Sequence, residues 1–92
     1  MIEKMLEQFL GLRDTATTSK KLHTLAKLAA DLTEAYTNGT LPASEYTELM
    51  ANINVTKLVV TNAEDIKTKQ ELAELVSKAV KFVTILARIP RP

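Results

Sequence analysis

The chain has 92 residues, of which 46% are hydrophobic and 25% charged, a composition typical of one small globular domain. It contains no cysteine, which excludes disulfides, thiolate metal sites and a cysteine nucleophile. The net charge is only +1, but the charges are unevenly placed. Residues 1–56 hold five Lys or Arg against seven Asp or Glu, and residues 57–92 hold seven against four, so the C-terminal part is basic.

The segment 1–12 predicts a first helix. Its apolar residues recur with the spacing of one helix face: Ile2, Met5, Leu6, Phe9 and Leu10. Gly11 offers a C-terminal stop, and residues 13–19 predict a linker that ends in a helix cap. Because Glu3, Lys4 and Glu7 interrupt the apolar run, we expect neither a cleaved signal peptide nor a membrane span. The expectation is a soluble, cytoplasmic protein.

The middle of the chain predicts two antiparallel helices. Between residues 18 and 38, apolar positions step by three and four: Leu22, Leu25, Ala29, Leu32 and Tyr36. The pair Asn38-Gly39 ends this helix, because both residues tolerate the left-handed backbone conformation. Pro42 suits the first turn of the next helix, which we predict for residues 42–60. The β-branched run 53–61 leaves a strand open as the alternative.

A long last helix is predicted for residues 62–89, followed by a short basic tail, 90–92, that contains proline. Asn62 can cap this helix, Asp65 occupies the capping-box position, and Pro90 stops it. Its apolar positions cover more than half of the circumference, whereas a surface helix needs a stripe of only about 100°. Together the four segments predict an all-α fold: one domain spanning 1–92, a small bundle of about four helices with antiparallel neighbours, which further copies could complete.

No residue pattern predicts catalysis. His23 is the only histidine, and Lys20 and Lys27 lie one turn away, where positive charge disfavours a metal ion. Glu71 and Glu74 could share a cation, but the Glu-x-x-His pattern of a helical di-metal site is missing, so we interpret them as surface ion pairs. We therefore expect no enzyme activity, no cofactor, no metal ion and no small-molecule substrate.

The excess apolar width of the last helix predicts a non-enzymatic protein–protein interaction or assembly module. It would bind a partner protein or further copies of itself, and a homo-oligomer is expected. The predicted interface is the apolar face of that helix: Leu72, Leu75, Val76, Ala79, Phe82, Val83, Leu86 and Ile89.

The basic residues of the same region predict an alternative, a small regulatory protein that binds nucleic acid or an acidic protein surface non-specifically. The candidate contacts are Lys78, Lys81, Arg88 and Arg91. So few cations predict weak, salt-sensitive binding. The segment 42–53 has Glu45 and Glu48 but no Lys or Arg, which excludes it as a DNA-reading helix. Membrane binding is not expected, because the last helix has no Trp and other helices can cover its apolar face.

Overall fold

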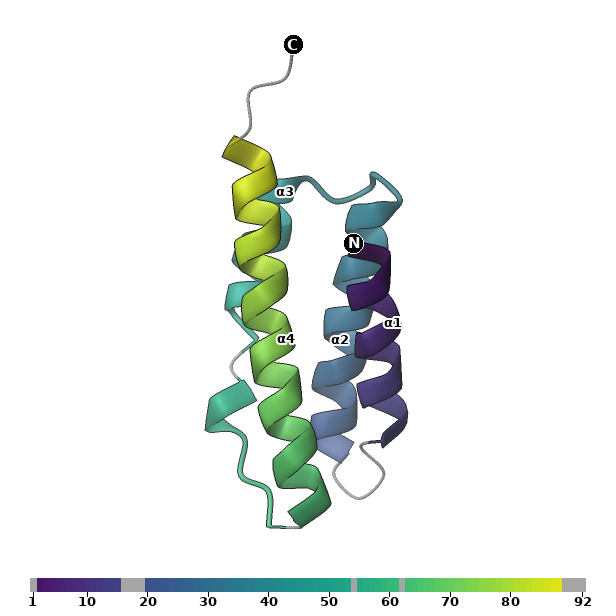
Figure 1. Cartoon of the computed structure of the whole chain (residues 1–92), viewed down its shortest axis with the longest axis vertical. Coiled ribbons are helices and arrows are strands. Elements are labelled where there is room, and N and C mark those ends of the chain that lie inside the picture. The colour runs from purple at the N-terminus through teal and green to yellow at the C-terminus, as the bar shows by residue number, and fades with distance from the viewer. Residues whose placement is uncertain (1, 16–19, 54, 62, 89–92) are drawn as a thin grey trace.

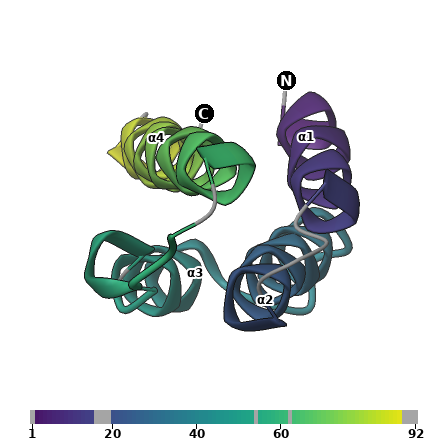
Figure 2. The same cartoon turned by 90° about the horizontal axis from the view of Figure 1, so that it is seen from below.

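The computed structural model describes residues 2–15, 20–53, 55–61 and 63–88, and it has the predicted all-α architecture (Figure 1). The described residues form no strand; their helices are α1 (Ile2–Thr15), α2 (Lys20–Thr37), α3 (Ala43–Ala51), the short 3₁₀-helix η1 (Val55–Lys57) and α4 (Ala63–Arg88). Each α-helix runs antiparallel to the one before it. Seen end-on, α1 and α4 form one layer and α2 and α3 the other (Figure 2).

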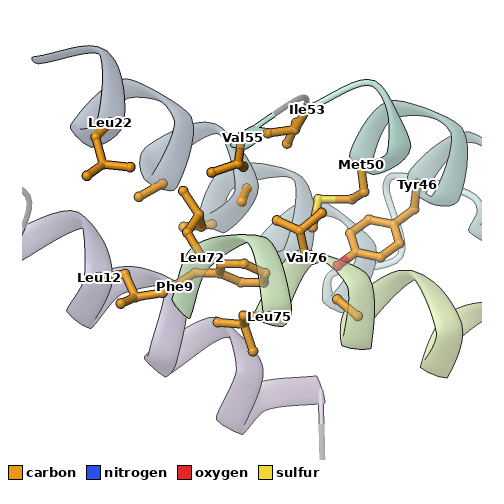
Figure 3. Packing of buried hydrophobic residues seen from close by; sticks show 14 of the residues in the cluster. Phe9, Leu12, Leu22, Tyr46, Met50, Ile53, Val55, Leu72, Leu75 and Val76 are labelled. Carbon is orange, nitrogen blue, oxygen red and sulfur yellow. The ribbon is translucent and has the colours of Figure 1, made fainter. Parts of the chain in front are cut away.

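The hydrophobic core lies where the helices face one another (Figure 3). Phe9 from α1 packs beside Leu72 and Leu75 of α4, and Met50 from α3 lies near Val76. These side chains are almost completely buried, with exposed fractions of 7% or less. The core thus draws on all the α-helices, and none of them buries its apolar face alone.

The first helix is longer than predicted. Gly11 does not stop α1, which continues to Thr15. The reason is Leu12, which follows Phe9 by three residues and is also buried, so the helix must pass Gly11 to bring Leu12 into the core. The predicted linker 13–19 therefore begins later, and its residues 16–19 lie outside the described part of the chain.

The turn between α2 and α3 forms as predicted. Gly39 adopts a positive φ of 79°, and the amide of Thr40 donates to the carbonyl of Ala35 at 3.0 Å, which closes the helix C-terminus. Pro42 precedes the first residue of α3 with φ −62° and ψ 152°. Its fixed φ and missing N–H suit this position.

The prediction of helix through residue 60 is wrong, and the strand alternative is wrong too. Helix α3 ends at Ala51, and the amide of Ile53 donates to the carbonyl of Met50 in a turn. Leaving the helix lets Ile53 and Val55 both face the core, with exposed fractions of 7% and 3%. A single 3₁₀ turn, η1, follows, closed by the amide of Leu58 donating to the carbonyl of Val55. Burial of β-branched residues thus outweighs helix continuation.

Helix α4 is the long element of the molecule. It has 26 residues and is about 39 Å long, whereas α3 has nine residues and is about 14 Å long. The C-terminal turns of α4 therefore extend beyond the other helices, at the top of Figure 1. The predicted cap residue Asn62 lies outside the described residues, while Glu64 and Asp65 stand in the first turn as expected.

Candidate functional site

The structure places most of the predicted interface in the core of the chain itself. Five of the eight residues have exposed fractions of 7% or less: Leu72, Leu75, Val76, Ala79 and Val83. Helix α4 contacts α1, α2 and α3, so its wide apolar face is covered from three directions. The sequence interpretation is corrected on this point, because contacts with three helices of the same chain account for the apolar width of α4. For the other three residues, Phe82, Leu86 and Ile89, the interface stays a prediction.

The exposed large apolar residues of α4 lie at its two ends: Ile66 near the start is 41% exposed, and two more lie together near the C-terminus. Phe82 packs partly against the core, while Leu86 is 38% exposed and Ile85 is 60% exposed. Leu86 continues the inward-facing stripe but lies in the last turn of α4, which ends at Arg88. Ile85 points outward, and sequence reasoning missed it because it lies off the heptad-like stripe. Ile89 lies outside the described residues.

Two of the four predicted basic contacts border this surface. Lys78 and Lys81 are both exposed, and with Ile85 they fall within about 60° on the outward side of α4. The side chain of Arg88 and all of Arg91 lie outside the described part of the structure. The outward side of α4 therefore combines one large aliphatic side chain with two cations, and we call Lys78, Lys81 and Ile85 the basic face.

Two open grooves flank α4. One, of about 370 Å³, lies between α3, η1 and α4, with Met50 and Val76 among its lining residues and Ser77 and Lys81 on the α4 side. The other, of about 420 Å³, lies between α1 and α4 and is lined by Gln8, Gly11, Leu12, Glu71, Glu74, Leu75 and Lys78. The second groove carries both charge signs. Neither groove gathers side chains in an arrangement typical of catalysis.

His23 is exposed, and it makes a contact that no local sequence pattern predicts. Its Nδ1 lies 2.9 Å from the carbonyl oxygen of Arg13, so a protonated Nδ1 donates to that carbonyl. The bond links the start of α2 to the end of α1. Within the described residues no three His, Cys, Asp or Glu side chains come together as a metal site.

The buried polar groups belong to the α2–α3 contact. The Thr33 hydroxyl donates to the Ala29 carbonyl at 2.8 Å, which leaves its oxygen to accept from the Tyr46 hydroxyl at 2.9 Å. The Tyr46 ring also stacks on Tyr36, with ring centres 4.9 Å apart. Burial raises the pKa of Tyr46, and the bond to Thr33 opposes that effect. Because every polar group here has a partner, this cluster fixes the register of two helices.

Comparison with protein-family models, with curated proteins and with solved structures gives no match. Among the described helices, none is both long enough and apolar enough to span a membrane. The function must therefore be argued from the surface of the bundle.

Proposed function

We propose that the chain is a non-enzymatic protein–protein interaction or assembly module that binds through the C-terminal end of α4. The observation that carries the proposal is the exposure of Ile85 and Leu86, two consecutive large aliphatic residues in the last turn of α4. Covering them would remove apolar surface from water without opening the core. The five buried residues of the predicted interface stabilise the fold: Leu72, Leu75, Val76, Ala79 and Val83.

The charges beside this surface favour an acidic partner. Lys78 and Lys81 are exposed next to Ile85, and the sequence has no Asp or Glu after Glu74. An apolar centre with a charged rim is the usual anatomy of a protein interface. The rim charges would add association rate and specificity more than affinity.

Site-specific photo-crosslinking tests the proposal. A photoreactive amino acid replaces Ile85 in the full chain, within the cells that make the protein, and the adducts are separated by mass. We expect protein adducts from position 85 and none from the matched position Lys4, an exposed residue of α1. The absence of any protein adduct from position 85 would overturn the proposal.

The second candidate is weak binding of nucleic acid through the same cations, and the exposure of both Lys78 and Lys81 supports it. Two or three phosphate contacts predict an affinity that falls steeply with salt. Nuclease-sensitive adducts from position 85, in place of protein adducts, would favour this candidate.

A further inference from the structure

Two segments of the chain carry charges of one sign only. Between residues 28 and 56 the sequence contains Asp31, Glu34, Glu45 and Glu48 and no Lys or Arg. This segment forms most of the α2–α3 hairpin. The C-terminal half of α4 has the opposite composition, because its charges are all positive after Glu74.

The α2–α3 hairpin also exposes aliphatic side chains among its acids. Leu28 is 43% exposed and Leu49 is 42% exposed. The stacked rings of Tyr36 and Tyr46 show how α2 and α3 are aligned against each other. In this antiparallel alignment both leucines lie on the same side of the hairpin. Leu28 lies about 80° from Tyr36 around its helix and Leu49 about 60° from Tyr46, both toward the outside of the hairpin.

Two acids lie beside these leucines. Asp31 follows Leu28 by three residues and Glu45 precedes Leu49 by four, which are the spacings of neighbours on a helix surface. Both carboxylates are exposed. We call Leu28, Asp31, Glu45 and Leu49 the acidic face.

The acidic face and the basic face lie on opposite sides of the molecule. In the end view, α4 belongs to one layer and the α2–α3 hairpin to the other (Figure 2). Ile85, Lys78 and Lys81 point away from the hairpin, whereas Leu28 and Leu49 point away from α4. The two faces of one chain therefore cannot contact each other.

Resting on the proposed function, we propose that the partner of the basic face is the acidic face of a second copy of this chain. Each face has exposed aliphatic surface, Ile85 on one and Leu28 with Leu49 on the other. The charged residues that define the two faces have opposite signs, with Glu74 next to Lys78 and Lys27 next to Asp31 as the only described neighbours of the other sign at i, i+4 spacing. Because the two faces are different and lie on opposite sides, the contact is head-to-tail. Such a contact repeats from copy to copy and produces a ring or an open chain.

Few large aliphatic residues contribute to each face, so the contact is expected to be weak. The dissociation constant should be about micromolar or higher, as for small interfaces. It should also weaken as salt is added, because the charged rims are exposed.

Charge reversal on one face at a time tests the inference by sedimentation equilibrium, from about 10 to 500 µM at low salt. The wild-type chain should show an average mass that rises with concentration above the monomer mass of 10.2 kDa. The double variant Lys78→Glu/Lys81→Glu leaves both faces acidic, and Asp31→Lys/Glu45→Lys leaves both basic. Each variant alone should associate roughly tenfold more weakly or worse.

An equimolar mixture of the two variants should recover the association, because every contact then joins an acidic to a basic face. The matched control, Lys4→Glu/Lys57→Glu, changes the net charge by the same amount as the α4 variant on exposed positions outside both faces. It should associate like the wild type. Circular dichroism confirms that each variant is folded.

A further variant that changes no charged residue tests the contact even if a charge-reversed chain fails to fold. Ile85→Ser should weaken self-association roughly fivefold through lost apolar contact alone. A wild-type chain that stays monomeric at every concentration overturns the inference. So does a mixture of folded variants that fails to recover association.

The experiments distinguish failure of the head-to-tail contact from failure of the proposed function. A monomeric wild-type chain whose position 85 still forms adducts with a protein of another mass overturns the head-to-tail contact and leaves the interaction module standing. The absence of protein adducts from position 85 removes the proposed function itself.

Discussion

The middle and the C-terminal end of α4 carry the same apolar pattern but have different surroundings. Leu72, Val76, Ala79 and Val83 are buried, whereas Leu86, which continues their spacing, is 38% exposed. The difference comes from the neighbours, because the C-terminal end of α4 extends past the ends of α1 and α3 (Figure 1). Periodicity determines which side of a helix is apolar. The lengths of the neighbouring helices determine how much of that side remains available to a partner.

The largest expected effect comes from truncating the middle of the stripe. Leu72→Ala should lower the free energy of unfolding by about 3 kcal/mol, because Leu72 is fully buried and its removal leaves a cavity among α4 and its neighbours. The matched substitution Leu86→Ala should cost less than about 1 kcal/mol, since that side chain is already partly in water. Urea unfolding followed by circular dichroism measures both. Equal losses would contradict the comparison.

The fold was predictable because helix periodicity and turn chemistry agree along most of the chain. The stripe through Leu22, Ala29 and Tyr36 and the turn at Asn38-Gly39 gave α2 and its antiparallel partner correctly. Helix ends were harder, because they depend on contacts with distant segments. Helix α1 continues past Gly11 because this buries Leu12. Helix α3 ends at Ala51 because the change of direction buries Val55. Neither reason is visible in a local window.

The candidate site was less predictable than the fold. The stripe that predicted an interface is mostly core, because a helix that packs against several helices of its own chain and a helix that binds a partner have the same sequence pattern. Lys78 and Lys81, two of the predicted basic contacts, are exposed, and their role in binding stays a prediction. Ile85 was missed, since one aliphatic residue off the stripe has no periodic signal. The segregation of acidic and basic faces required the arrangement of the helices in space.

A smaller effect is expected at the contact that fixes α3 against α2. Tyr46→Phe removes the hydroxyl that donates to Thr33, at a cost of about 1 kcal/mol at neutral pH. The cost stays modest because Thr33 keeps its bond to the Ala29 carbonyl. Thermal unfolding at pH 7 measures it. A loss above about 3 kcal/mol would mean that the hydroxyl also supports the packing of the α4 stripe.

The same residue predicts a pH dependence. Because burial raises the pKa of Tyr46 above 10.0, the folded chain holds the phenol proton more tightly than the unfolded chain does. This contribution to stability is fully present below pH 10 and is lost as the pH rises through the folded-state pKa. The stability advantage of the wild type over Tyr46→Phe should therefore shrink above pH 10. A difference that stays constant to about pH 11.5 would contradict this assignment.

The groove between α1 and α4 should tolerate added volume at Gly11. Gly11 is helical, and a Cβ there would meet no atom within 4 Å, so Gly11→Ala should stabilise the chain by about 0.5–1 kcal/mol. The matched change Gly39→Ala should destabilise it by about 1 kcal/mol, because φ there is +79°. A destabilising Gly11→Ala would indicate that the groove between α1 and α4 closes in solution.

The smallest effect on stability is expected at the exposed end of α4. Ile85→Ser should change the free energy of unfolding by less than about 0.5 kcal/mol, because Ile85 is 60% exposed and lies outside the core. Urea unfolding at low protein concentration, where self-association is absent, measures it. The contrast with Leu72→Ala would then separate folding from binding within one helix. A loss of 2 kcal/mol or more would instead place Ile85 in the folded core and remove it from the proposed interface.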